Sequence, residues 1–425
     1  MKNPIYHSLK SNLLILSVAF FGLKFYQSTP IEEVMGIPHI LFLGIMGILA
    51  STFLIRQLIL KRNLNVYIVY LFSLMIIVPF WSMLRSNVAF GQPYYFGILA
   101  ERNWLVICAG IVLYKNILKN PGFIDAIEKI FLRLSILTLT IYSSIYIFYD
   151  LSQFSEYLFV EETDLRGYRL KLNIFFINIG LFYQFIKFYD KRKLHNFLLF
   201  LFFFLYGLIV IQGRVYILSI LMCLGIFIFY QLKEKTFSSK ALYLIYSTMA
   251  LLFFLFIISV FNPVFIENLT FMFSQLISVS MGDISYDPSA NSRIFQSIIA
   301  LGVINESSNN LWLGVGKLSH QWEKGYEGIF GHFFPTDLGV LGVLFEYGII
   351  GIIFLNIIPV IACFVIMNRI KTNDLFLVSL KYTLLFYILT CFYTGNFLFS
   401  PQEYVLIFFI FLGLLKAKSI RLDPF

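Results

Sequence analysis

Residues 331–351 read GHFFPTDLGVLGVLFEYGIIG, and this stretch decides how the chain is organised. It begins at the end of a polar segment of 74 residues, 262–335, and it runs into an apolar segment that extends to residue 367. A helix needs ~20 mostly apolar residues to cross the hydrocarbon core of a bilayer. The junction therefore predicts a membrane protein in which one large loop precedes a spanning helix.

The composition excludes a soluble protein. Of the 425 residues, 59% are hydrophobic, 19% are aromatic and only 13% are charged, whereas soluble domains carry roughly 25% charged residues. The net charge of +9 follows membrane topology and does not indicate a nucleic-acid partner. Four cysteines lie inside apolar runs without metal-ligand spacing, and we expect them to be small buried hydrophobes: Cys108, Cys223, Cys363 and Cys391.

The predicted fold class is all-α, a polytopic membrane protein of about twelve transmembrane helices. We predict a single integral membrane domain over residues 1–425, with residues 262–335 as its long extracytoplasmic loop. Gln212 and Gly213 alone separate the seventh and eighth spans, which predicts a tight hairpin. The predicted spans are 11–27, 38–57, 64–83, 96–116, 133–150, 171–189, 195–212, 214–232, 241–261, 345–367, 376–396 and 402–416.

The basic residues predict the orientation of these spans. With the N-terminus inside, 21 of the 32 basic residues fall on the cytoplasmic side and nine on the opposite side, while Lys24 and Lys381 lie inside or near span ends. The excess of Lys and Arg on one side places both termini in the cytoplasm and the long loop outside. Within that loop, residues 292–304 have helical apolar spacing and are predicted to lie on the membrane surface. Residues 309–325 are rich in Gly, Asn and Ser and are predicted to be coil.

Three arginines on the outer side are candidate anion ligands. Arg214 begins the eighth span, Arg293 begins the predicted surface helix, and Arg102 follows Glu101 in the outer third of the fourth span. A guanidinium binds phosphate through two parallel hydrogen bonds and keeps its charge at a membrane boundary. The simpler interpretations are that Arg214 extends its charged end to the interface, that Arg293 flanks a helix, and that Arg102 joins an ion pair.

His332 and Asp337 are the candidate general bases, because a base must reach the proton that it removes and have a suitable pKa. A histidine in an aromatic stretch is more often structural, so the choice between the two stays open. The sequence has no Asp-x-Asp, P-loop, GxGxxG or metal-ligand cluster, so neither a metal nor a cofactor is expected. A donor substrate would therefore have to be activated already.

The chain resembles the superfamily of bacterial O-antigen polymerases and O-antigen ligases over residues 200–355. Residues 213–218, GRVYIL, are similar to the arginine-headed span of the family, and ten residues separate Arg214 from Gly225 as in the R-x10-G pattern of polymerases. Residues 311–316, LWLGVG, followed by the run from His332 to Gly351, are similar to a second block of the family. The span layout and the single long loop extend the resemblance to the whole chain.

Ligases typically show His-Asn, nine residues, and then G-x-x-G. Counting back from Gly348 and Gly351 places Asp337 and Leu338 there, and His332 lies five residues earlier. This departure favours a polymerase over a ligase that transfers glycan to the lipid A core. A lipid or solute transporter is an alternative of another class, although transporters usually have two similar halves with binding residues at mid-membrane.

The resemblance implies a GT-C-like fold and an inverting, metal-independent glycosyltransferase of the bacterial inner membrane. It would transfer a glycan from undecaprenyl diphosphate to a sugar hydroxyl of another lipid-linked repeat unit. On this reading Arg214, Arg293 and Arg102 bind the diphosphate, and Asp337 or His332 takes the proton. The implied partners are the lipid-linked oligosaccharide and membrane lipid, with a chain-length regulator as a further candidate.

Overall fold

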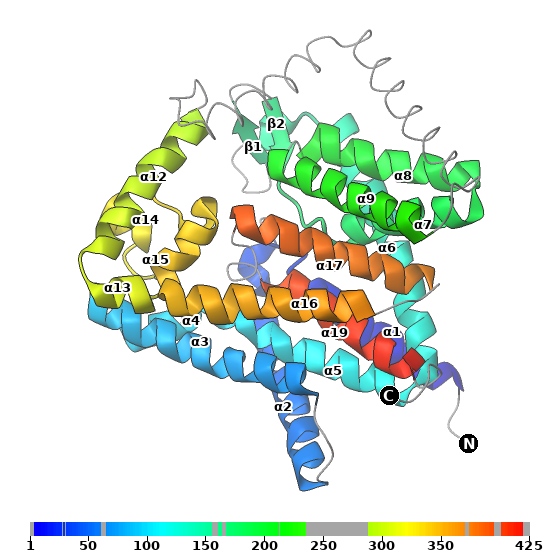
Figure 1. Ribbon diagram of the computed structural model, residues 1–425, viewed down its shortest axis with the longest axis horizontal. Coiled ribbons are helices and arrows are strands. Elements are labelled where there is room, and N and C mark those ends of the chain that lie inside the picture. The colour runs from blue at the N-terminus through cyan, green and yellow to red at the C-terminus, as the bar shows by residue number, and fades with distance from the viewer. Residues whose placement is uncertain are drawn as a thin grey trace. The chain divides into compact units, whose positions relative to one another are not determined.

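The computed structural model describes residues 4–27, 29, 31–60, 65–154, 160–163, 167–211, 213–234, 288–369, 374–394 and 401–419. The described chain is mostly helical, with one short β-hairpin (Figure 1). It divides into two compact units, one formed by residues 1–131 with 293–425 and the other by residues 132–292. Each unit is described by itself.

The first unit combines helices from both ends of the chain. Its N-terminal elements are α1 (Pro4–Ser17), the π-helical turn η1 (Val18–Gly22), α2 (Glu32–Ile59), α3 (Val66–Phe90), α4 (Tyr94–Ala100), the 3-10 turn η2 (Arg102–Leu105), α5 (Val106–Lys119) and the start of α6 (Pro121–Phe148). Its later elements are most of α12 (Pro288–Asn305), then α13 (Ser308–Leu313), α14 (Tyr326–Phe330), the 3-10 turn η5 (Pro335–Leu338), α15 (Val340–Gly351), the π-helical turn η6 (Ile352–Ile357), α16 (Ile358–Arg369), α17 (Leu375–Thr394) and α19 (Pro401–Ser419).

Helices α5 and α19 pack closely at the centre of this unit. The residues of α19 from Val405 to Leu414 are all buried, as expected for a helix that is apolar on every side. A Cβ atom at Gly110 of α5 would lie 2.3 Å from a ring carbon of Phe409. The absence of a side chain at Gly110 therefore lets the two helices approach each other.

The second unit contains the rest of α6, the 3-10 turn η3 (Leu151–Phe154), β1 (Val160–Thr163), β2 (Gly167–Leu170), α7 (Phe175–Lys191), α8 (Leu194–Tyr206), the π-helical turn η4 (Gly207–Ile211) and α9 (Arg214–Glu234). Helix α7 is buried from Phe175 to Ile186 and packs on α8. The two strands pair antiparallel, with Val160 opposite Leu170. Helix α9 begins soon after η4 ends at Ile211, so a short connection joins them as predicted, while Gln212 lies outside the described residues.

Five helical segments of the described chain are long and apolar enough to cross a membrane, or six if the bent pair Tyr94–Ala100 and Arg102–Lys119 counts as one span. The chain is therefore a multi-pass helical membrane protein. The five are Val34–Ile59, Val66–Phe90, Pro121–Phe148, Leu194–Ile211 and Val340–Val365, and shorter apolar helices cover Leu9–Gly22, Val215–Tyr230 and Leu375–Cys391. The predicted number of twelve is not established by these helices, and the ninth predicted span, 241–261, lies outside the described residues.

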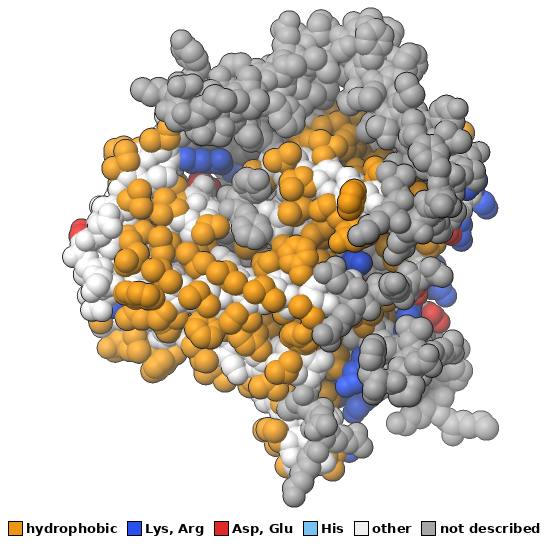
Figure 2. All heavy atoms as spheres, viewed as in Figure 1, with side chains coloured by type: hydrophobic (Ala, Val, Ile, Leu, Met, Phe, Trp, Pro, Cys, Tyr) orange, Lys and Arg blue, Asp and Glu red, His pale blue; other side chains and the backbone are white. Residues whose placement is uncertain are grey.

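A broad apolar surface extends over α3 and α16 (Figure 2). Its exposed side chains include Ile76, Ile77, Phe80, Ile361 and Phe364. Soluble proteins rarely expose so much contiguous apolar area. We interpret this surface as one that faces lipid.

The loop before α15 is more regular than its composition indicates. The predicted helix at 292–304 is confirmed, because α12 covers Pro288–Asn305. The prediction of coil over 309–325 was wrong at its start, because α13 forms there, with the Ser307 side chain accepting a hydrogen bond from the Asn310 backbone N–H at 3.1 Å. Serine is a favoured residue at this N-cap position. The cysteines are confirmed as buried: Cys108, Cys223, Cys363 and Cys391.

A break in α15 anchors the loop to the membrane helices. Gly348 has φ +69° and ψ −172°, a conformation almost restricted to glycine. Because the helix is interrupted there, carbonyls upstream of the break accept hydrogen bonds from another segment: Val315 N–H donates to Phe345 O at 2.9 Å and Gly316 N–H donates to Glu346 O at 2.8 Å. We call residues 314–317 the anchor segment.

The side chains of α3 hold the other side of the anchor segment. Arg85 Nε donates to Gly314 O at 2.7 Å, and Ser82 Oγ accepts from Lys317 N–H at 2.8 Å. A Cβ atom at Gly316 would lie 2.3 Å from the carbonyl oxygen of Ser82. The segment therefore fits between α3 and α15 only when a glycine stands at this position.

We predict that Gly348→Ala destabilises the protein strongly. A Cβ atom there would lie 2.4 Å from the backbone of Trp312, and the backbone conformation alone costs an L-residue about 1–3 kcal/mol. The melting temperature of the purified protein in detergent should fall clearly. Gly302→Ala on α12 is the control, because its Cβ atom meets nothing within 4 Å and alanine is the better helix former. Equal melting temperatures for the two variants would refute this account of the break.

Candidate functional site

The anchor segment joins a group of cations at one end of the first unit. Lys317 closes the segment, Lys24 lies in the turn after η1, and Arg102 begins η2. The charges of Arg102 and Lys317 both act on the Lys24 ammonium. We call these three residues the cation cluster.

Local structure positions each member of the cation cluster. Lys24 adopts a positive φ of 52° in its turn, and its Nζ donates a hydrogen bond to Asn103 Oδ1 at 2.6 Å. Arg102 is exposed where the fourth span bends by 54° between α4 and η2. Gln92 fixes Lys317 from the turn after α3, because its Nε2 donates to Lys317 O at 3.1 Å.

The pKa of Lys24 reflects the burial and the charges of the cation cluster. The pKa of Lys24 falls from 10.5 to about 8: partial burial is the largest cause, the neighbouring charges of Arg102 and Lys317 add to it, and Glu32 opposes them. Burial also raises the pKa of the adjacent Tyr26 to about 12. Lys24 is thus the member of the cluster whose charge changes near neutral pH. A concentration of cations that depresses a lysine pKa is the environment expected where an anion binds.

Two buried carboxyl groups lie beneath the cations. Glu101 and Glu346 are 1% and 2% exposed. The Tyr347 hydroxyl donates to Glu101 Oε1 at 2.6 Å, and the charge of Lys317 acts on Glu346. Within the described part of the chain, Oε2 of each carboxyl group has no hydrogen-bond partner. Buried polar atoms are rarely left unpaired, so these oxygens mark a polar interior that extends below the cation cluster.

The predicted base candidates lie on a second face of the same unit. His332 and Asp337 are both exposed, on either side of the buried Phe333. Helix α12 holds this stretch, because the Phe334 backbone N–H donates to Gln296 Oε1 at 2.8 Å. Arg293 is exposed one turn before Gln296. The structure therefore brings the helix of Arg293 together with the segment that carries both candidate bases.

Aromatic packing connects this second face to the anchor segment. Tyr326 contacts Phe333 with ring centroids 5.8 Å apart and Phe345 at 5.4 Å. The Tyr326 hydroxyl donates to Gly316 O at 2.6 Å. Lys317 and the candidate bases thus adjoin one continuous core, which also contains Ala300, Ile304, Val315 and Leu318.

Arg214 belongs to the other unit of the chain. It begins α9 in the second unit, and its side chain lies outside the described part of the structure. Its predicted contact with an anion therefore stays a prediction. Of the three predicted arginines, the structure places Arg102 with other cations and Arg293 beside the 332–337 segment.

Sequence reasoning missed Lys24, Lys317 and Glu346 as members of a site. Lys317 had a usable signal, because the topology prediction assigns it to the side of the membrane where few cations are expected. Glu346 also had one, because an acidic residue inside an apolar span is a functional candidate by default. Lys24 had the same signal, because it lies in the predicted first span, but its neighbours Asn103 and Arg102 come from a distant part of the chain.

The connections that carry these groups lie at the same end of the helices. Gln92 and the loop around Lys317 are bonded to each other, as are Lys24 and Asn103. Lys418, near the end of α19, forms an ion pair with Asp374, which precedes α17. The topology prediction assigns both residues to the cytoplasmic side.

No protein-family model matches the chain, and no curated protein matches it. The resemblance to O-antigen polymerases and ligases therefore depends on the sequence motifs described above.

We predict that anion binding at the cation cluster weakens as the pH rises through about 8. Lys24 is charged below its pKa of about 8 and neutral above it, so its attraction for an anion is lost at higher pH. The affinity for inorganic pyrophosphate, measured by titration calorimetry without divalent cations, should fall about tenfold between about pH 7 and pH 9. Lys24→Arg should keep its affinity over this range, because arginine stays charged. The same fall in both proteins would exclude Lys24 as the cause.

Proposed function

We infer that this protein is an oligosaccharide repeat-unit polymerase of O-antigen or capsule type, a glycosyltransferase with a polyprenyl-diphosphate-linked donor. The observation that carries the proposal is the cation cluster at one end of a lipid-facing helical bundle. A lipid-linked diphosphate requires both features, because its two phosphates need cations and its tail needs an apolar surface. The sequence resemblance supplies the class of reaction.

In this proposal the cation cluster neutralises the diphosphate leaving group. The acceptor hydroxyl attacks the anomeric carbon of the donor, and the bond between that carbon and the diphosphate oxygen breaks with inversion. Negative charge then develops on the diphosphate, where Arg102, Lys24 and Lys317 stabilise it. Stabilisation of developing charge is usually the largest catalytic contribution, about 3–4 kcal/mol for a single donor. Arg293 is a further proposed ligand of the diphosphate, and a role of Arg214 in binding it stays a prediction of the sequence resemblance.

The proton of the acceptor hydroxyl passes to Asp337 or His332. Both side chains are exposed and lie on the segment that Gln296 of α12 holds in place. An exposed base is accessible to a second glycan chain that approaches from solvent. The spacing to Gly348 and Gly351 favours Asp337, while an imidazole has the more suitable unperturbed pKa.

The remaining parts of the proposal concern the membrane. The polyprenyl tail lies against the apolar surface of α3 and α16, the bundle has about twelve spans in a GT-C-like arrangement, and both termini are cytoplasmic in a bacterial inner membrane. The reaction then occurs on the extracytoplasmic side and needs no metal or cofactor. Its partners are the lipid-linked oligosaccharide, membrane lipid and, as a further candidate, a chain-length regulator.

We predict that Arg102→Ala, Arg293→Ala and Arg214→Ala each abolish polymer formation. Purified protein in lipid vesicles with EDTA and undecaprenyl-diphosphate-linked repeat units should give a product ladder, and each variant should lower its rate about 10²–10³-fold. Arg56→Ala is the matched control, because Arg56 is exposed in the last turn of α2. A normal ladder from any of the three variants would remove that arginine from the mechanism.

Cells that lack the protein should keep single repeat units on their glycolipid, whereas a ligase defect would leave none.

We predict that one of Asp337→Asn and His332→Asn lowers the rate about 10²–10⁴-fold while the other stays near the unmodified protein. The rate of the unmodified protein should rise with pH as the base loses its proton. The variant without the base should lose the corresponding rise in rate. Full activity in both variants would show that the proton acceptor lies elsewhere.

A further inference from the structure

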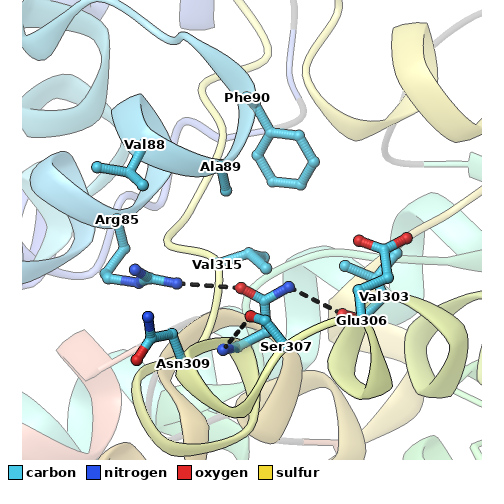
Figure 3. Close-up of a pocket in the computed structure, with 10 residues that line it drawn as sticks. Arg85, Val88, Ala89, Phe90, Val303, Glu306, Ser307, Asn309 and Val315 are labelled. Carbon is cyan, nitrogen blue, oxygen red and sulfur yellow. Dashed lines mark hydrogen bonds between the residues drawn. The ribbon is translucent and has the colours of Figure 1, made fainter.

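A pocket of about 180 Å³ lies between the end of α3 and the connection from α12 to α13 (Figure 3). All of its residues belong to the first unit. Arg85 lines one end of the pocket and also donates a hydrogen bond to Gly314 O of the anchor segment. Its lining residues are Arg85, Val88, Ala89, Phe90, Val303, Glu306, Ser307, Asn309, Asn310 and Val315.

The pocket has one apolar wall and one polar wall. Val88, Ala89 and Phe90 of α3 face it from one side, and residues 306–310 face it from the other (Figure 3). The polar wall carries a carboxylate, a hydroxyl and amides, so it offers both hydrogen-bond donors and acceptors. This division suits a ligand with an apolar face and a polar edge.

Hydrogen bonds fix the polar wall in advance. Asn310 accepts from Arg85 Nη2 at 3.1 Å and donates through Nδ2 to Val303 O at 2.9 Å. Its backbone N–H donates to Ser307 Oγ at 3.1 Å. A wall held in this way loses little conformational freedom when a ligand binds.

The charges of the pocket differ from those of the cation cluster. The guanidinium of Arg85 donates to two neutral oxygens, Gly314 O and Asn310 Oδ1, and the carboxylate of Glu306 lines the same pocket. A second phosphate site would need an excess of cations, which this lining lacks. The pocket is therefore suited to a neutral polar ligand.

We propose that this pocket binds one neutral sugar ring of the glycan, with the apolar ring face on Phe90 and the hydroxyls on residues 306–310. The proposal rests on the proposed function, because it assigns a subsite to the same substrate. The pocket is smaller than the roughly 300–1,000 Å³ of sites for drug-sized molecules, which fits a single ring. The anchor segment runs from Gly314 beside this pocket to Lys317 of the cation cluster, three residues that could span at most about 10 Å. A diphosphate at Lys317 and a nearby sugar at Arg85 would thus bind along one backbone segment.

The test measures sugar binding directly. Neutral methyl glycosides of glucose, galactose, N-acetylglucosamine and rhamnose are added to the purified protein, and binding is followed by saturation-transfer NMR. At least one glycoside should give a signal, and the double variant Glu306→Ala with Asn309→Ala should weaken its affinity about tenfold. Neither of these side chains makes a hydrogen bond within the described part of the chain, so the fold should be retained. Ala89→Trp is a second variant, which fills the pocket from its apolar wall.

The matched control is Asn305→Ala with Glu323→Ala, which changes an exposed amide and an exposed carboxylate outside the pocket. This control should bind the glycosides as the unmodified protein does, and every variant should bind inorganic pyrophosphate equally. The proposal is overturned if no glycoside binds, if the pocket variants bind as well as the control, or if pyrophosphate displaces the glycoside from the pocket.

The vesicle assay separates this proposal from the proposed function. If the protein binds glycosides, the pocket variants abolish this binding and the protein makes no polymer, the sugar site is supported and the polymerase function is rejected. Polymer formation that the pocket variants leave unchanged, together with no glycoside signal, would keep the polymerase and reject the sugar site.

Discussion

The hydrogen bonds from the anchor segment to the interrupted helix α15 are the constraint on which this end of the protein depends. Val315 and Gly316 donate to the carbonyls of Phe345 and Glu346, and they can do so because Gly348 breaks the helix one turn later. Unpaired backbone groups are costly at membrane depth, so a helix break is tolerated where another part of the protein satisfies them. Two glycine-containing motifs that are separate in the sequence are thus one structural unit.

The charged groups derive their positions from this unit. Lys317 directly follows the bonded residues of the anchor segment, and Glu346 supplies one of the accepting carbonyls while its own side chain is buried. Tyr347, the next residue, donates to Glu101 at the bend of the fourth span. Cations and carboxyl groups are therefore placed by backbone pairing and not by flexible side chains on a surface. Such preorganisation is what electrostatic stabilisation of a reacting group requires.

The sequence was most informative where the physics is local. Apolar run length placed the membrane helices, and the spacing of Ile294 and Ile298 placed α12. Composition misled at residues 309–313, because Ser307 and the packing of α13 on α15 outweigh the preference of Asn and Ser for coil. The cation cluster could be predicted only for Arg102, since Lys24 meets it through a contact across 79 residues of chain. The sequence offered one signal for Lys317, its predicted place on the side with few cations, and one for Glu346, an acidic residue within a span. Neither signal shows which residues come together in the fold.

The anchor has a consequence for the way such chains diverge. Because main-chain atoms make its central bonds, the anchor constrains mainly the glycines at 314, 316 and 348 and the side chains that bond its backbone, which are Ser82, Arg85, Gln92 and Tyr326. Most neighbouring positions are free to change as long as they stay apolar or polar as their surroundings require. Two proteins that share this architecture can therefore differ at nearly every residue of the region, and their kinship would be preserved in the spacing of a few glycines.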